Sequence, residues 1–239
     1  MISIHNIEKS FGRTKVLEQV SLELHKGQSI ALIGPNGSGK TTLIKCLLGL
    51  AIPDSGDIRI NDQSIKGAWE YRSCIGYMPQ IGRYPDNITV LQLFDMIREI
   101  RRGTFERIDE DLLKAFNVQS FGNKTMRSLS GGTRQKVSAC LAFMFDPDIL
   151  ILDEPTAGLD PVSVEILKEK VIEEQRKGKL VLITSHILSD LEDLTEEVVF
   201  LNEGKLIFFK KVEELKRETG SGNLSKAIAR IMEEQQLQA

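Results

Sequence analysis

The chain has 239 residues, of which 41% are hydrophobic and 27% charged, and its 31 basic and 34 acidic side chains give a formal net charge of -3. This composition is typical of a globular protein and excludes a disordered or fibrous one. The near balance of charge argues against a protein that coats nucleic acid, because the basic stripe of such proteins raises the isoelectric point above ~9.

No membrane span or secretion signal is expected. The longest uninterrupted apolar run, residues 139–145, is much shorter than the ~20 residues that cross a bilayer. The first residues lack the basic and apolar regions of a secretory signal, which makes a cytoplasmic location the expectation. Cys46, Cys74 and Cys140 are scattered without metal-ligand spacing, so we expect reduced thiols.

Strands and helices are expected to alternate along the chain. Strands are predicted where apolar or alternating runs are bounded by turn residues, and helices where apolar residues recur every three to four positions. The expected strands are residues 21–24, 29–33, 58–60, 75–78, 149–152, 180–184, 198–201 and 206–209, the last two forming a hairpin. The first helix is expected directly after residue 39. The middle third is expected to be helical because of its apolar stretches at 90–100 and 112–116. Further helices are expected at 139–145 and 162–177, and a short terminal helix after a hinge at 220–222. This alternation predicts an α/β protein with a mainly parallel sheet.

The segment Gly-Pro-Asn-Gly-Ser-Gly-Lys-Thr at 34–41 fits the G-x-x-x-x-G-K-[ST] phosphate loop, between an apolar strand and a helix. Glycines let the backbone wrap a polyphosphate, and the helix N-terminus supplies positive potential. Lys40 is expected to reach the β and γ phosphates, and Thr41 to offer a hydroxyl to Mg2+. The predicted ATP contacts are Gly34, Pro35, Asn36, Gly37, Ser38, Gly39, Lys40, Thr41 and Thr42. The alternative is a glycine-rich turn that fits by accident.

Two adjacent carboxylates, Asp153 and Glu154, follow the apolar run 149–152, at the strand end where open α/β sheets bind ligands. We expect Asp153 to hold Mg2+ through water and Glu154 to polarise the water that attacks the γ phosphate. A helix cap after a strand would be the structural alternative.

A second glycine-rich segment, Leu129-Ser130-Gly131-Gly132, opens a predicted helix. Its backbone amides could form another anion site at a helix N-terminus. On physical grounds alone, a simple capped helix start is the favoured interpretation.

The three motifs occur in an order that resembles the ATP-binding subunits of ABC transporters, from about Ile2 to Phe209. The Leu-Ser-Gly-Gly signature distinguishes that family from other phosphate-loop ATPases. The resemblance implies a phosphate-loop NTPase core with a mainly parallel sheet, an N-terminal antiparallel β subdomain and an inserted α-helical subdomain. We expect an ATPase domain at 1–219, with the helical insertion at about 81–145, and a short helical tail at 220–239.

The resemblance also implies further site residues. Gln80 matches the Q-loop glutamine that senses Mg2+ and the attacking water, and His186 matches the switch histidine. Phe11 matches the aromatic residue that stacks on adenine, although it could instead pack in the first sheet. Residues 157–160 match the D-loop. Thr133 departs from the family, which usually has glutamine there, and we expect the contacts of Ser130 and the glycine amides to survive this substitution.

In the family, ATP is held between the phosphate loop of one subunit and the signature helix of another. The resemblance therefore implies a dimer with a second copy of this chain, in which Ser130, Gly131 and Gly132 contact the γ phosphate. It further implies a membrane permease partner, placing the chain on the cytoplasmic face of the cell membrane. The C-terminal region resembles export-type systems, with a likeness to the ATPase for copper-site maturation of nitrous oxide reductase. The alternative is a soluble ABC ATPase that acts on nucleic acid or ribosomes, and the acidic balance argues against direct nucleic-acid binding.

Overall fold

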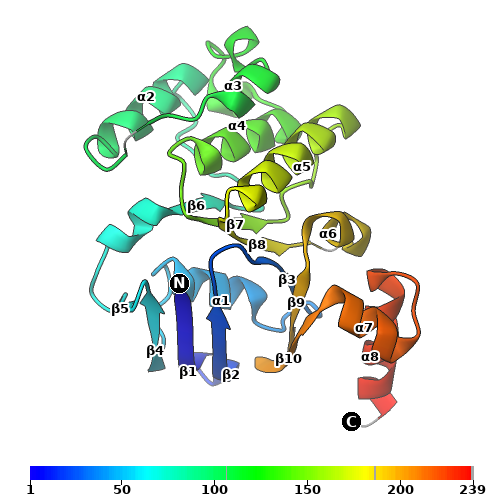
Figure 1. The fold of residues 1–239 in the computed structure, drawn as a ribbon. Helices are drawn as coiled ribbons and strands as arrows, with labels where there is room; N and C mark the ends of the chain where they lie inside the picture. The colour runs from blue at the N-terminus through cyan, green and yellow to red at the C-terminus, as the bar shows by residue number, and fades with distance from the viewer. Residues whose placement is uncertain (106, 186, 238–239) are drawn as a thin grey trace. The chain divides into compact units, whose positions relative to one another are not determined.

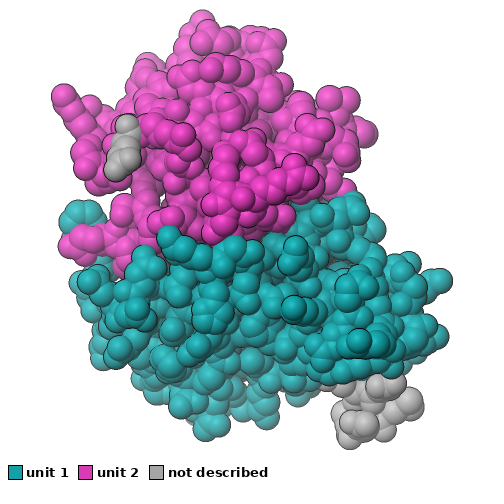
Figure 2. Space-filling view, in the orientation of Figure 1, with its two compact units in different colours: residues 1–69, 182–239 teal, residues 70–181 magenta. Residues whose placement is uncertain are grey.

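The computed structural model describes residues 1–105, 107–185 and 187–237. It divides into two compact units, one of residues 1–69 and 182–239 and the other of residues 70–181 (Figure 2). Both units combine strands with helices, and the predicted α/β class is confirmed. Within the described residues, no helix combines the length and the apolar character that a membrane span requires.

The first unit begins with an antiparallel sheet in the order β2-β1-β4-β5 (Figure 1). Its strands are β1 (Ile2–Phe11), β2 (Thr14–Leu24), β4 (Ser55–Ile60) and β5 (Gln63–Ser64). Ile2 pairs with Leu24 on one side and with Ile60 on the other, and all three side chains are buried. This sheet is the N-terminal β subdomain that the resemblance implied.

The same unit contains three further strands around the phosphate loop. Strand β3 (Ser29–Ile33) runs parallel to β9 (Glu197–Asn202), which pairs antiparallel with β10 (Lys205–Lys211). Every residue of β3 is buried, as expected for a strand covered on both faces.

Four helices complete the first unit: α1 (Lys40–Leu47), α6 (Leu188–Leu194), α7 (Val212–Thr219) and α8 (Leu224–Leu237). The C-terminal helix α8 contacts α6 and α7 and buries Leu224, Ala227 and Ile228. The backbone N–H of Leu224 also donates to Glu192 Oε2 at 3.1 Å. The C-terminal segment is therefore a helix that belongs to the first unit.

The second unit contains a parallel strand pair, β6 (Ile75–Met78) beside β7 (Ile149–Asp153), and helices α2 to α5 (Figure 1). The helices are α2 (Val90–Ile100), α3 (Asp111–Ala115), α4 (Gly131–Phe143) and α5 (Pro161–Arg176), with 3-10 turns at Glu70–Cys74, Val118–Ser120 and Met126–Ser128. Helix α4 packs on β6, and α3 contacts α4 and α5. Strand β8 (Leu180–Thr184) leads the chain from this unit back into the first.

A cluster of buried charges holds α5 in the second unit. The ammonium of Lys170 has a side-chain exposure of only 3% and lies 2.6 Å from Asp109, 2.7 Å from Asp111 and 3.1 Å from Glu174. Burial alone would lower the pKa of Lys170, but its hydrogen bonds to these carboxylates raise the pKa above the usual range. The ion pairs of Lys170 therefore connect residues 109–111 to α5, and each charged group is stabilised by the opposite charge of its partners.

The cluster continues to the turn before β7. Glu174, which is 1% exposed, also pairs with Lys177 at 2.8 Å and with Lys179. Lys179 pairs in turn with Asp146, whose other partner is Arg107 at 2.6 Å. Burial acts to raise the pKa values of Glu174 and Asp146, but the cationic partners outweigh it and lower both.

We predict that Lys170→Met lowers the free energy of unfolding by about 3–5 kcal/mol at neutral pH, because it removes the buried cation that the buried carboxylates of Asp109 and Glu174 share. Urea unfolding of the purified chain measures this loss. The matched control is Lys114→Met, which removes an exposed ion pair to Glu110 on α3 and should cost less than about 0.5 kcal/mol. Equal losses in the two variants would contradict the prediction.

The same cluster predicts the direction of acid sensitivity. Because the folded-state pKa values of Glu174 and Asp146 lie below their ordinary 4.5 and 3.8, their stabilisation is present above those values and is lost as the pH falls through the folded pKa. The raised pKa of Lys170 matters at high pH. Its contribution to the stability of the fold is complete below the ordinary pKa of 10.5 and is lost as the pH rises through the folded-state pKa.

Candidate functional site

The phosphate loop of the first unit is shaped by glycines that no larger residue could replace. A Cβ at Gly34 would collide with the carbonyl oxygen of Leu201, and one at Gly39 would lie 2.7 Å from the carbonyl oxygen of Val16. Gly39 also has a φ of 104° at the N-cap of α1, a left-handed conformation that favours glycine. The loop is therefore pressed against the backbone of β2 and of the β9–β10 hairpin.

The hairpin turn after β9 supports this loop in a way that sequence reasoning missed. The backbone N–H of Gly204 donates to the carbonyl of Ser38 at 3.1 Å, and Glu18 N–H donates to Gly204 O at 2.8 Å. The only signal in the sequence was a turn-forming segment at 202–205, which does not reveal its target. The turn fixes the backbone that would surround a phosphate.

The polar groups of the loop are arranged for an anion. Lys40 Nζ donates to the carbonyl oxygens of Gly34 at 2.7 Å and Pro35 at 2.9 Å, so its charge lies over the loop. The buried Ser38 Oγ has no hydrogen-bond partner among the residues that the structure describes. Helix α1 has no side-chain cap and no acidic residue in its first turn. Its N-terminal amides and dipole therefore face outward without an internal anion.

In the second unit, Gln80 and Glu154 meet after the ends of β6 and β7. Gln80 Nε2 donates to Glu154 Oε2 at 2.9 Å, which brings two of the predicted catalytic residues together. Asp153 is 8% exposed at the end of β7, and Glu154 follows it with a φ of 50°. A glutamate in this conformation is uncommon and is typical of functional sites, where surrounding contacts hold the strain.

The signature segment caps α4 beside these carboxylates. Ser130 is the exposed N-cap residue, and its Oγ accepts the N–H of Thr133 at 3.2 Å. A Cβ at Gly132 would collide with the carbonyl oxygen of Gly158, whereas nothing lies within 4 Å of one at Gly131. The first signature glycine therefore borders open space, and the second is packed on the predicted D-loop.

Two side chains of α4 that the sequence did not single out connect this helix to the same loops. Gln135 Nε2 donates to the carbonyl oxygen of Glu154 at 3.4 Å. Lys136 Nζ lies 2.9 Å from Asp160 Oδ2, and hydrogen bonds from Lys136 and Ser163 hold the pKa of Asp160 far below its usual range. Both residues lie inside a predicted helix, where their polar character alone indicated only a solvated face.

Phe11 and His186 complete the predicted set. Phe11 ends β1 with 54% of its surface exposed, so its ring is not part of the buried core of the first sheet. Lys9 Nζ lies 5.4 Å from the centre of its ring. Stacking on adenine stays a prediction for this accessible ring. His186 lies outside the described residues, and Thr41 and Thr42 lie in the first turn of α1.

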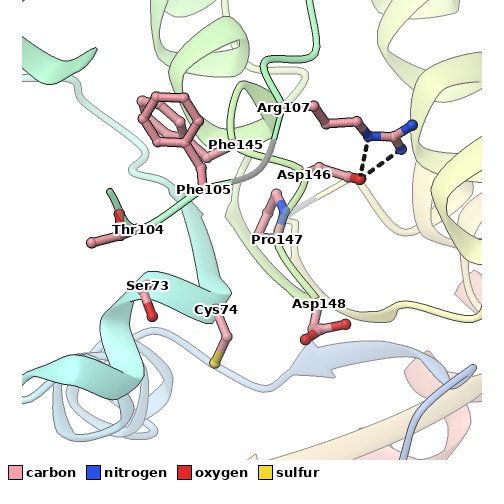
Figure 3. A pocket seen from close by; sticks show the side chains of 9 residues that line it. All are labelled: Ser73, Cys74, Thr104, Phe105, Arg107, Phe145, Asp146, Pro147 and Asp148. Carbon is pink, nitrogen blue, oxygen red and sulfur yellow. Dashed lines mark hydrogen bonds and ion pairs between the residues drawn. The ribbon is translucent and has the colours of Figure 1, made fainter. Parts of the chain in front are cut away.

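The second unit also has an open pocket of about 270 Å³ at the N-terminal ends of β6 and β7 (Figure 3). Cys74 and Asp148, which directly precede β6 and β7, line it together with Arg107 and Asp146 of the buried charge cluster. Because Gln80 and Glu154 follow the other ends of the same strands, this pocket is separate from the predicted catalytic residues.

The residues present fit ATP and Mg2+. The glycine cradle, Lys40 and the buried Ser38 hydroxyl suit a polyphosphate. Thr41 and Asp153 supply the hydroxyl and carboxylate oxygens that Mg2+ prefers. The described residues hold no cluster of three or more His, Cys, Asp or Glu side chains suited to a metal.

The fold and these residues define a phosphate-loop nucleoside triphosphatase. A family model described as ABC transporter matches residues 17–157. The chain is 32% identical over 219 residues to the Nod factor export ATP-binding protein I of Ralstonia nicotianae, covering 90% of this chain and 68% of that protein. It is also 32% identical over 226 residues to the lantibiotic transport ATP-binding protein SrtF of Streptococcus pyogenes, covering 94% of each.

A solved structure described as an ATP binding subunit of an ABC transporter matches with a TM-score of 0.89 and 28% identity, covering 97% of this chain and 99% of that one. The chain therefore belongs to the ABC transporter family, as an ATP-binding subunit that hydrolyses ATP. The predicted fold, family and enzyme class are confirmed. The roles of individual site residues stay predictions, as do the domain bounds and the likeness to the copper-site maturation ATPase.

The two signature glycines give a test of the observed packing. We predict that Gly132→Ala lowers the free energy of unfolding by about 1–3 kcal/mol, because its methyl group must displace the backbone at Gly158. Gly131→Ala is the matched control, since its methyl group enters open space and α4 tolerates alanine. Urea denaturation without nucleotide measures both. A Gly132→Ala protein as stable as the control would contradict this packing.

Proposed function

We propose that this chain is the ATPase subunit of an export-type transporter and works as a homodimer closed by ATP. The observation that carries the proposal is the exposed Ser130, which caps a helix start without acidic residues in its first turn, in a chain with one phosphate loop. In a two-fold dimer, each loop would bind ATP and each signature helix would contact the ATP of the other subunit. Two complete sites would then need two copies.

The site residues have separate roles in this proposal. Lys40 and the loop amides neutralise the phosphates, and Phe11 stacks on adenine. Glu154 polarises the attacking water, and Gln80 orients the Glu154 carboxylate through their 2.9 Å hydrogen bond. His186 is proposed to contact the γ phosphate. Thr41 and Asp153, with Gln80 nearby, would hold Mg2+, which offsets the charge of the β and γ phosphates when bound.

The signature segment would complete this chemistry from the opposite subunit. Ser130 and the amides of Gly131 and Gly132 would bind the γ phosphate only while that phosphate is present, so ATP binding closes the dimer. Hydrolysis and phosphate release remove the negative charge that these donors contact. The nucleotide thereby becomes the switch for a mechanical step.

The segment after Gln80 is proposed to contact a membrane permease. Ile81 is 65% exposed and Pro85 is also exposed, whereas Tyr84 is half-buried and donates from its hydroxyl to Ser138 Oγ of α4 at 2.9 Å. A permease that shifts this segment would therefore act on both Glu154 and the signature helix. The chain would lie on the cytoplasmic face of the cell membrane without entering the bilayer.

The names of the two relatives, Nod factor export and lantibiotic transport, support an export role. Co-purification of this chain with a polytopic membrane protein tests the permease, and crosslinks from residues 81–88 identify the contact. Crosslinks to nucleic acid or ribosomes, without a membrane protein, would favour the soluble ABC ATPase instead.

We predict that Glu154→Gln lowers the rate of ATP hydrolysis by about 10²–10⁴-fold, because the amide cannot accept the proton of the attacking water. The variant should still bind ATP and Mg2+ and should accumulate as a dimer, measured by light scattering after size-exclusion chromatography. The double variant Lys40→Ala, Glu154→Gln is the control and should stay monomeric. A Glu154→Gln protein that binds ATP but remains monomeric would overturn the sandwich dimer.

A further inference from the structure

The hydroxyl of Thr133 contacts the signature serine directly. Thr133 Oγ1 lies 2.8 Å from Ser130 Oγ, and Thr133 N–H donates to the same Ser130 oxygen at 3.2 Å. Ser130 is exposed at the helix start, and Thr133 is half-buried one turn later. The residue that departs from the family pattern is thus bonded to the residue that the proposed function places on ATP.

Other helix starts of this chain show what a residue at Thr133's position can do. At α2, Thr89 Oγ1 accepts Gln92 N–H at 3.2 Å, and the Gln92 side chain accepts Thr89 N–H at 2.9 Å. This reciprocal pair is a closed capping box. A glutamine at position 133 could close α4 in the same way, but the shorter threonine instead reaches the serine hydroxyl.

At α5, Ser163 shows the donor geometry that we infer for Thr133. Its backbone N–H and its hydroxyl donate to the two carboxylate oxygens of Asp160, at 3.0 and 2.7 Å. The direction is fixed there, because a carboxylate can only accept. At α4 the N-cap is a hydroxyl, and either hydroxyl of the Ser130–Thr133 pair could be the donor. If Thr133 donates, the Ser130 proton remains available for another acceptor.

Resting on the proposed function, we propose that Thr133 is a positioning residue that turns the Ser130 hydroxyl into a directed donor for the γ phosphate of the second copy's ATP. A serine hydroxyl has one proton and two acceptor lone pairs. In the proposed arrangement Thr133 donates both its N–H and its O–H to Ser130 Oγ, and these two donors occupy both lone pairs. The Ser130 proton can then point only away from the helix, toward an anion at its N-terminus.

The electrostatics favour this direction. An anion near Ser130 can only accept, so it selects the arrangement in which Ser130 donates outward and Thr133 donates to Ser130. Donation from Thr133 polarises the Ser130 hydroxyl and strengthens its bond to the anion. The absence of acidic residues from the first turn of α4 leaves the helix dipole to act in the same sense.

The test uses Thr133→Val and Thr133→Ser in the Glu154→Gln background. Valine keeps the shape and the backbone N–H but removes the hydroxyl, whereas serine keeps the hydroxyl. We expect Thr133→Val to raise the ATP-dependent dimer dissociation constant about 10- to 100-fold, because two symmetric bonds to a charged acceptor are weakened. Thr133→Ser should stay within about threefold of the parent. Light scattering over a range of protein concentrations measures both.

Two readouts separate positioning from a loss of structure. The melting temperature and the binding of fluorescent ATP to the monomer should match the parent, because Thr133→Val changes neither the cap N–H nor the phosphate loop. In a double-mutant cycle, Thr133→Val should have no further effect on dimerisation once Ser130→Ala is present. A Thr133→Val dimer as tight as the parent, or an undiminished effect without the serine hydroxyl, overturns the inference. If the Glu154→Gln parent binds ATP and stays monomeric, the proposed function itself fails.

Discussion

The arrangement of the second unit depends on how Glu154 is held. Its side chain accepts from Gln80 Nε2 at 2.9 Å, and its carbonyl oxygen accepts from Ala157 N–H at 3.2 Å and from Gln135 Nε2 at 3.4 Å. These bonds stabilise a left-handed backbone that costs roughly 1–3 kcal/mol for a non-glycine residue. The segment after β6, the end of β7 and the signature helix thus converge on one glutamate. A displacement of Gln80 must change the direction of that carboxylate.

The strands of the parallel sheet could be predicted almost to the residue, while other elements could not. The runs 75–78 and 180–184 have the observed bounds because a strand covered on both faces is continuously apolar. Strand β1 was missed by pattern, since its pairing with β2 is irregular and Asn6 has a φ of 47°. These irregularities interrupt the alternation that marks a strand. The apolar stretch at 112–116 gives only the short α3, and α4 ends at Phe143, two residues before the expected end.

The parts of the site that consist of contiguous residues could be predicted from the sequence. The contacts between residues that are distant in the sequence could not. The glycines of the phosphate loop and the Asp153-Glu154 pair are local motifs with a mechanical reason for each residue. The support from Leu201 and Gly204 comes from a hairpin more than 160 residues later in the chain. Nothing in a turn sequence specifies which backbone it will contact. The hydrogen bond from Tyr84 to Ser138, which lie 54 residues apart in the sequence, was hidden for the same reason.

The N-termini of the helices in this chain differ in the groups that cap them. Helix α5 begins with Asp160, so its N-terminus already has an internal carboxylate, and α2 begins with the closed pair of Thr89 and Gln92. Helix α1 begins with Gly39 and no side-chain cap, and α4 begins with a hydroxyl that can still donate. Of these four described helix starts, α1 and α4 have neither an internal carboxylate nor a closed capping box. The two predicted phosphate contacts therefore lie at helix starts whose N-terminal amides are not matched by a carboxylate of the chain.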